Sequence, residues 1–435
     1  MKQNLWPELI KLVKQHVKPA LGCTEPIAVA LASAVARSYL KQIPNKIEVE
    51  LSPNLFKNCM GVIVPGTGIA GAKIAAALGA LAGNPDAGLE VLKNISEDAI
   101  AQAKQMIANQ QINIVIAQDC DKALYVKCTL STSDNDDMVA VSIADAHTNV
   151  IRIEHNHQAI FESDKQSINH HGNMAFGEFT FKDIFDFATN VPFDDIAFIL
   201  QAKELNNRLS QEGLTNAYAM EIGKTLMSKQ ESGLLDSSLL SNIIIRSSSA
   251  ADARMGGAQF PAMSNSGSGN QGIAATMPVV VVAEKFAPND KDKLARALIL
   301  SHLSAIYIHL KLPALSAFCA VSSASMGAAT AIAWLITGKY DVATKSVTNM
   351  IGDVSGVICD GASGSCALKV STAVAAAYKA VLLAMDNRVV PKSDGFISSD
   401  IDETINHLCS IASQGMQETD KLIIQMMYEK NLNQI

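Results

Sequence analysis

Hydrophobic and polar positions follow two different periods in the first part of the chain. Residues 6–18 and 25–41 repeat apolar positions with the period of a helix, whereas 46–52 alternates residue by residue, as a strand does. A glycine-rich turn at 64–71 opens an Ala-rich helix, and another helix covers about 95–109. Segments rich in β-branched residues then predict short strands between polar turns, at 112–118, 123–131, 138–145, 150–156 and 158–163. This pattern predicts an antiparallel sheet with helices.

After a polar loop at residues 163–179, the hydrophobic positions repeat with the period of a helix. Helical patterns cover about 181–189, 193–211, 215–229, 235–254, 270–286, 290–311, 315–337, 341–358, 366–386 and 399–430. The segment VVVVAE at 279–284 has strand propensity, but its Ala- and Met-rich surroundings favour a buried helix. We therefore predict an α+β protein, with an α+β domain over 1–175 and an all-helical domain with buried apolar helices over 176–435.

One segment, residues 317–337, contains no charged residue and is long enough to span a membrane. It is rich in Ala, Gly, Ser and Thr, and aromatic or basic anchors are sparse at its ends. A helix that is apolar on all sides is also what the centre of a large soluble core requires. We therefore expect a buried central helix and no membrane partner.

Composition narrows the possible partners and compartments. Hydrophobic residues make up 49% of the chain and charged residues 18%, which supports a large core. The formal net charge is −7, and no block of Lys and Arg could follow a phosphate backbone, so nucleic acid is not an expected partner. The N-terminus lacks the features of a signal peptide, which predicts a cytoplasmic protein. A homo-oligomer is compatible with the sequence.

Cysteines provide the first candidate chemistry. In a reducing compartment, the eight cysteines favour thiols, metal ligands or catalysis over disulfides. Cys359 and Cys366 flank the short loop Asp-Gly-Ala-Ser-Gly-Ser, whose small residues let a backbone wrap closely around a bulky group. A helix that begins near Cys366 would offer its positive end to an anion, and Cys319 could fold back against the loop. The spacing alone leaves zinc, a redox pair and simple packing open.

A second candidate is Cys23, in the segment Gly-Cys-Thr-Glu-Pro at 22–26. The residues after it suit the first turn of a helix, so Cys23 lies at a helix entry. That position is expected to lower the pKa of the thiol and to favour a nucleophile or a general base. The alternative is a cysteine that only packs there.

The third candidate is a Gly- and Ser-rich segment at 264–272 that leads into a helix. Ser266, Gly267 and Ser268 could form a cradle for a carboxylate, and Asn270 and Gln271 could add specific hydrogen bonds. The alternative is a solvent loop with an ordinary helix cap. The turn that contains Thr67 has the same architecture with a weaker signal, and it lacks the Gly-Lys-Ser/Thr ending of a phosphate-binding loop.

Other polar residues are less informative. Four histidines close in sequence could bind a metal, but surface positions explain them better; they are His155, His157, His170 and His171. Cys120 and Cys128 lie in or beside strands and are expected to pack. Three lysines could in principle form a Schiff base, although nothing around them indicates a pyridoxal phosphate site; they are Lys73, Lys224 and Lys369.

Four motifs resemble one known family. GCTEP at 22–26, KNCMGVIVPGTG at 57–68, NSGSGNQGI at 265–273 and ICDGASGSCALK at 358–369 are similar, in the same order, to those of L-cysteine desulfidases and of the alpha chains of iron–sulfur L-serine dehydratases. The resemblance covers nearly the whole chain. The short interval between the last two cysteines is like that of the desulfidases. Cys59, within the second motif, departs from the family pattern.

The resemblance implies a site and a reaction. Cys319, Cys359 and Cys366 would hold a 4Fe-4S cluster with one iron open to substrate, and Cys23 matches the proposed catalytic cysteine. The Ser/Gly/Asn loop and Thr67 would bind substrate. The implied reaction is β-elimination of L-cysteine to hydrogen sulfide, pyruvate and ammonia. Alternatives are an L-serine dehydratase with the same cluster, a non-catalytic iron–sulfur or thiol sensor, and a membrane component.

Overall fold

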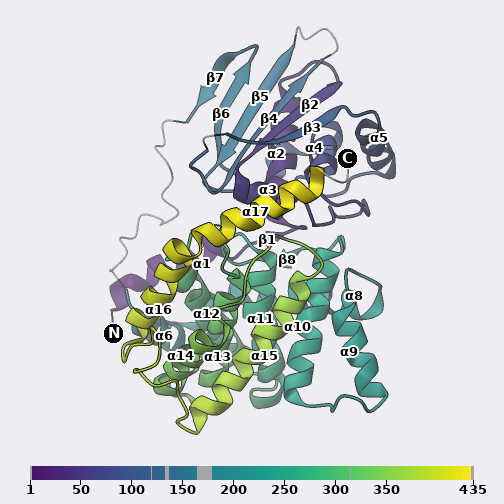
Figure 1. The fold of residues 1–435 in the computed structure, drawn as a ribbon. Helices are drawn as coiled ribbons and strands as arrows, with labels where there is room; N and C mark the ends of the chain where they lie inside the picture. Colours follow the sequence, from purple (N-terminus) through teal and green to yellow (C-terminus); the bar gives the residue numbers. More distant parts are fainter. Residues whose placement is uncertain (1, 119, 133–136, 164–178, 314, 433–435) are drawn as a thin grey trace.

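The structure is a computed structural model that describes residues 2–118, 120–132, 137–163, 179–313 and 315–432. It has a sheet-containing unit at one end and a helical unit at the other (Figure 1). The predicted α+β class is confirmed. The polar loop that was expected to separate the two units, including His170 and His171, lies almost wholly outside the described residues.

The sheet of the first unit has six strands in the order β3-β2-β4-β5-β6-β7. The strands are β2 (Lys46–Leu51), β3 (Ile112–Ile116), β4 (Tyr125–Ser131), β5 (Met138–Ala144), β6 (Val150–His155) and β7 (Gln158–Glu162). All neighbouring pairs are antiparallel except β2 and β3, which run parallel. The sheet is therefore mixed, because the helices between β2 and β3 form the long crossover that a parallel pair requires.

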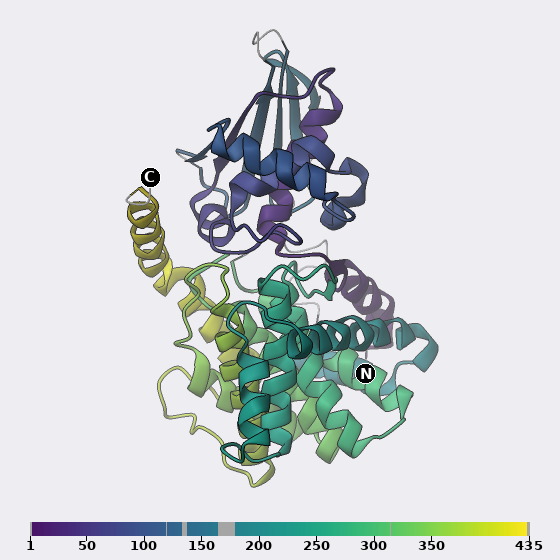
Figure 2. The same ribbon diagram turned by 90° about the vertical axis from the view of Figure 1, so that its right-hand side faces the viewer.

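Helices pack on one side of this sheet (Figure 2). They are α2 (Thr24–Ser38), α3 (Pro53–Cys59), α4 (Ala72–Ala82) and α5 (Glu97–Ala108). Small residues allow α2 and α4 to approach closely, since a Cβ on Gly79 would lie 2.2 Å from the carbonyl oxygen of Ala30. This contact holds α2, and with it the helix entry at Cys23, against the sheet unit.

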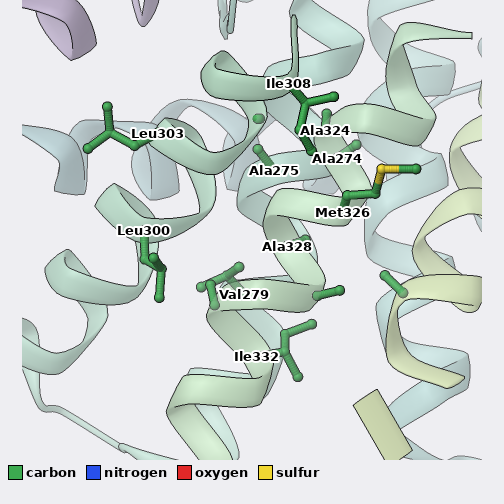
Figure 3. Close-up of a cluster of buried hydrophobic side chains, with 14 of the residues drawn as sticks. Ala274, Ala275, Val279, Leu300, Leu303, Ile308, Ala324, Met326, Ala328 and Ile332 are labelled. Atoms are coloured by element: carbon green, nitrogen blue, oxygen red, sulfur yellow. The ribbon is translucent and has the colours of Figure 1, made fainter. Parts of the chain in front are cut away.

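The second unit is largely helical, as predicted. Its helices are α6 (Phe181–Asn190), α7 (Phe193–Ile196), α8 (Gln201–Thr215), α9 (Ile222–Glu231), α10 (Leu239–Met255), α11 (Gly269–Phe286), α12 (Lys291–His309), α13 (Ala320–Thr337), α14 (Tyr340–Val354), α15 (Cys366–Met385), α16 (Ile401–Ser410) and α17 (Gln417–Leu432). Residues 279–284 belong to α11, so the choice of helix over strand is confirmed. Apolar side chains of α11, α12 and α13 meet in the centre of this unit (Figure 3).

Three segments cross between the two units. Helix α1 (Trp6–His16) buries Leu9, Leu12 and Val13 in the core of the helical unit. The two-residue strand β1 (Pro19–Ala20) pairs antiparallel with β8 (Ala262–Met263), a strand within the helical half that is too short to show in the sequence pattern. Helix α17 returns across the junction and packs on α3 (Figure 1).

Two helices of the described residues are long and apolar enough, by composition, to cross a membrane: α13 and α15. For α13, which lies within the segment singled out in the sequence, 78% of the apolar window is buried inside the protein. This is the burial of a central core helix, as expected. For α15 the buried share is 44%, and Leu368, Leu382 and Leu383 on it are exposed.

Candidate functional site

Residues from all the main motifs line one cavity of about 110 Å³ between the two units. The lining includes Cys23 and the three cysteines Cys319, Cys359 and Cys366. It also includes every residue of the 266–271 segment except Gly269. These positions are separated by up to hundreds of residues in sequence. The fold therefore brings together most of the candidate residues that the sequence indicated one by one.

Two of the cysteines lie on neighbouring extended segments. Phe318 and Ile358 form an antiparallel bridge, the Cys319 N–H donates to the carbonyl of Val357 at 3.0 Å, and the Cys359 N–H donates to Ala317 at 2.7 Å. Because side chains alternate along such a pair, the Cys319 and Cys359 side chains lie on the same side of it, at diagonal positions. This arrangement directs both thiols to one space.

The third cysteine, Cys366, is the first residue of α15 and closes the loop back toward the cavity. Its sulfur accepts from the Ser363 N–H at 3.5 Å and donates to the Gly361 carbonyl at 3.6 Å. Gly361 has a φ of +100°, and a Cβ there would lie 2.5 Å from the carbonyl oxygen of Lys57. Only glycine fits where the loop presses against α3, which explains the small residues between Cys359 and Cys366.

Lys57, on α3, fixes the segments that carry these cysteines. Its side chain is fully buried, and its ammonium donates to the carbonyls of Ser316 at 3.2 Å and Cys359 at 3.3 Å. It also pairs with Asp420 of α17 at 2.5 Å. A single buried cation thus joins two neighbouring segments of the site to the C-terminal helix.

Four helices begin at the cavity. Cys23 is the N-cap of α2, Ser268 of α11 and Cys319 of α13, and α15 begins at Cys366. The free N–H groups and the positive dipole ends of these helices raise the electrostatic potential inside the cavity. The cavity is therefore suited to hold negative charge.

Burial, however, opposes the thiolate forms of Cys23, Cys319 and Cys366. It raises the pKa of Cys23 to about 12, and the positive charge of nearby Arg254 offsets only part of this effect. The sequence-based expectation of a lowered pKa for Cys23 is therefore wrong for the described structure, since desolvation outweighs the helix terminus. Burial likewise raises the pKa of Cys319 to about 12 and that of Cys366 above its usual value.

The three cysteines at the cavity offer the donor type that an iron–sulfur cluster uses. Among the described residues, no group of three or more His, Cys, Asp or Glu side chains is close enough to hold one metal ion. Three thiols instead line a common cavity from separate segments, with a cradle of small residues and positive helix ends around them. Thiolates that each bind a different iron are the usual ligands of a cluster. The residues present thus fit a cluster with three protein ligands.

The Ser/Gly/Asn loop is anchored by buried hydrogen bonds. Asn265 donates from its side-chain amide to Nδ1 of His302 and to the His302 carbonyl, both at 3.1 Å, and His302 Nε2 lies 3.0 Å from the Thr276 hydroxyl. The Thr24 hydroxyl donates to the carbonyl of Gly267 at 2.6 Å and so joins the loop to α2. These contacts place Ser266, Ser268 and Gln271 at the cavity wall.

Several candidate residues have other roles. Thr67 does not line the cavity, because its hydroxyl donates to the Val64 carbonyl and accepts from the Ile69 N–H within its own turn. Cys59 and Cys128 are buried in the core of the sheet unit, which agrees with packing for Cys128. His155 pairs with Asp137 on the sheet.

Other lining residues escaped the sequence analysis. Those with polar or charged side chains include Glu25, Asn58, His147, Arg254 and His309. Arg254 is the most informative of them, because it is only 4% exposed. The sequence feature that could have indicated Arg254 is an arginine within a helical run of small residues, SSSAADARM at 247–255.

Comparison with known proteins identifies the family. The sequence model of the serine dehydratase alpha chain family matches residues 86–425, which is most of the chain. The chain therefore belongs to the serine dehydratase alpha chain family. More particularly, it resembles the UPF0597 proteins, and this resemblance covers nearly all of both chains.

Three of these relatives show the extent of the similarity. The UPF0597 protein of Actinobacillus pleuropneumoniae serotype 3 is 51% identical over 429 residues, which cover 99% of this chain and 98% of the relative. UPF0597 protein YE0448 of Yersinia enterocolitica is 52% identical over 430 residues, 98% of this chain and 97% of the relative. UPF0597 protein YhaM of Escherichia coli K12 is 50% identical over 431 residues, 98% of each chain.

Proposed function

We propose that this protein is an iron–sulfur lyase that eliminates the thiol of L-cysteine. L-Cysteine loses its Cα proton and its β-thiol to give hydrogen sulfide and aminoacrylate, which becomes an imine and takes up one water to give pyruvate and ammonia. The observation that carries the proposal is the single cavity lined by Cys23, the 266–271 segment and three further cysteines. Membership of the serine dehydratase alpha chain family independently favours an amino-acid lyase.

Cys319, Cys359 and Cys366 would hold the 4Fe-4S cluster. When bound with three protein thiolates, such a cluster supplies an open iron that acts as a Lewis acid toward a substrate carboxylate or a leaving group. The chain positions Cys319 and Cys359 through the 317–319 and 357–359 pairing and through Lys57, which holds the Cys359 carbonyl. The converging helix ends would stabilise the negative charge of the cluster.

We assign Cys23 the transfer of the Cα proton. Its sulfur lines the cavity and packs with Met255 and Cys366, close to the cluster ligands. Burial opposes its thiolate form, and the charge of Arg254 favours it in part. The starts of α2 and α11 would stabilise the negative charge that develops on the substrate as the proton leaves.

L-Serine is the second candidate substrate, because the matching family is named for a serine dehydratase. The same residues would then expel water in place of sulfide. The interval between Cys359 and Cys366, which resembles that of the desulfidases, favours L-cysteine.

The test uses full-length protein purified without oxygen. Iron and acid-labile sulfide are counted, and pyruvate and sulfide release are then measured with L-cysteine and with L-serine. We expect iron and sulfide in the ratio of a four-iron cluster and a higher kcat/KM for L-cysteine. A higher kcat/KM for L-serine would make L-serine the substrate in place of L-cysteine. Cluster-loaded protein that releases pyruvate from neither amino acid would refute the lyase.

A further inference from the structure

Arg254 is a buried cation, and its side chain is only 4% exposed. Its guanidinium donates to the Asn270 side-chain oxygen at 3.1 Å, to the Met255 sulfur at 3.4 Å and to the Gly22 carbonyl at 3.0 Å. Its Nε has no hydrogen-bond partner, and within the described part of the chain no carboxylate forms an ion pair with it. A buried charge without a counter-charge strongly destabilises a fold, so a residue in this state indicates a missing anion.

The surroundings of Arg254 increase the demand for an anion. A Cβ on Gly269 would lie 2.1 Å from Nε of Arg254, so the guanidinium packs directly against the first turn of α11. A cation at a helix N-terminus is the reverse of the favourable arrangement, because both carry positive charge. A negatively charged occupant of the cavity would stabilise this combination.

A second buried group indicates what else the occupant carries. The side-chain oxygen of Gln271, a residue only 1% exposed, has no hydrogen-bond partner although the residue lines the same cavity. This oxygen needs a donor. Glu25 is the one carboxylate in the described lining, and it adds negative charge at the cavity. An anion that also carries a cationic N–H donor, such as an α-amino acid, satisfies both orphaned groups.

We propose that Arg254 binds the α-carboxylate of the substrate and that the side-chain oxygen of Gln271 accepts a hydrogen bond from its α-ammonium group. This assignment rests on the proposed function and names the residues that recognise its substrate class. Arg254 is then a specificity residue, because amines that lack a carboxylate leave its charge uncompensated. The protein should therefore bind α-amino acids and reject the corresponding amides.

The test measures binding of L-alanine, which has no β-leaving group, and of L-alaninamide, which lacks the carboxylate. Calorimetric titration is carried out on the full-length protein with and without its iron. A hydrogen bond to a charged group corresponds to a factor of about 10 to 150 in affinity. We therefore expect wild-type protein to bind L-alanine at least about 10-fold more tightly than L-alaninamide. Failure of wild-type protein to bind L-alanine would refute the substrate class.

Arg254→Lys and Arg254→Leu test the residue itself. Both variants should weaken the binding of L-alanine about 10- to 100-fold and change the binding of L-alaninamide little. Gln271→Met should weaken both ligands equally, since both keep the ammonium group. The matched control is Arg246→Leu on the same helix, because Arg246 already pairs with Glu284, and it should leave both affinities unchanged. Unaltered L-alanine binding by Arg254→Lys would refute the assignment.

Thermal stability separates recognition from a structural role. Arg254→Leu removes an uncompensated buried charge, so its melting temperature should equal or exceed that of the wild type although ligand binding is lost. If Arg254 only compensated the negative charge of the cluster, its variants would lose iron and keep their affinity for L-alanine. That result would overturn the proposal. Arg254-dependent L-alanine binding without turnover of L-cysteine would instead refute the lyase and keep the recognition site. If Arg254→Leu does not fold, the L-alanine affinity of Arg254→Lys still tests the assignment.

Discussion

The buried ion pair between Lys57 and Asp420 gives the sharpest prediction about stability. Asp420→Ala removes the only carboxylate that pairs with Lys57 among the described residues, at a distance of 2.5 Å. At an effective dielectric constant of about 20, two unit charges at this distance attract by roughly 7 kcal/mol. The Lys57 ammonium would stay buried with two carbonyl acceptors, those of Ser316 and Cys359, which compensate part of the loss.

Asp420→Ala is therefore expected to lower the unfolding free energy by about 3–5 kcal/mol. This is the usual effect of leaving one charge of a buried ion pair without its partner. Because Asp420 keeps some exposure, with 13% of its side chain accessible, we expect the lower end of this range. Urea unfolding followed by circular dichroism measures the effect as a lower midpoint at an unchanged slope. Iron content should fall as well, because Lys57 holds the Cys359 carbonyl.

The double variant Lys57→Met/Asp420→Leu is the critical comparison. It removes both charges from the buried site, so its stability should recover to within about 1 kcal/mol of the wild type. Lys421→Ala is the matched control on α17, since its exposed pair with Glu418 contributes less than about 1 kcal/mol. A loss below about 1 kcal/mol in Asp420→Ala, or a double variant no more stable than the single one, would refute the reasoning.

The remaining predictions concern single residues. Cys23→Ser should keep its iron, measured by absorbance, and lose turnover by about 100-fold or more; normal pyruvate release would exclude Cys23 from the reaction. Cys359→Ala should lose the cluster, whereas Cys409→Ala, on α16, should retain it, and full iron loading in the former would contradict the ligand set. Thr67→Val should lower unfolding free energy by about 1–3 kcal/mol with kcat/KM unchanged. Burial lowers the pKa of His302 to about 3, so the unfolded chain binds more protons between about pH 6.5 and 3. Stability should therefore fall on acidification through this window, by up to about 1.4 kcal/mol per pH unit, and an equally steep acid limb in His302→Gln would refute this origin.

Local sequence patterns were sufficient for the elements, and for the cysteines and the 266–271 segment at the cavity. Period and propensity identified the strands β2 to β7 and the helical half, including the helix at 279–284, because each depends on contacts close in sequence. The same holds for Cys23 and Cys366, whose neighbours predict a helix start, and for the glycines that let the 359–366 loop approach α3.

Tertiary structure decided what depends on distant contacts. The sequence did not show that β2 and β3 run parallel, because pairing direction depends on how the helices between them cross the sheet. It suggested Thr67 by analogy, and only the fold shows its hydroxyl turned into its own turn. Burial, which reverses the expected pKa shift of Cys23 and encloses the charge of Arg254, arises from segments hundreds of residues apart. Charge inside a cavity is a property of the assembled walls, and no single stretch of sequence contains it.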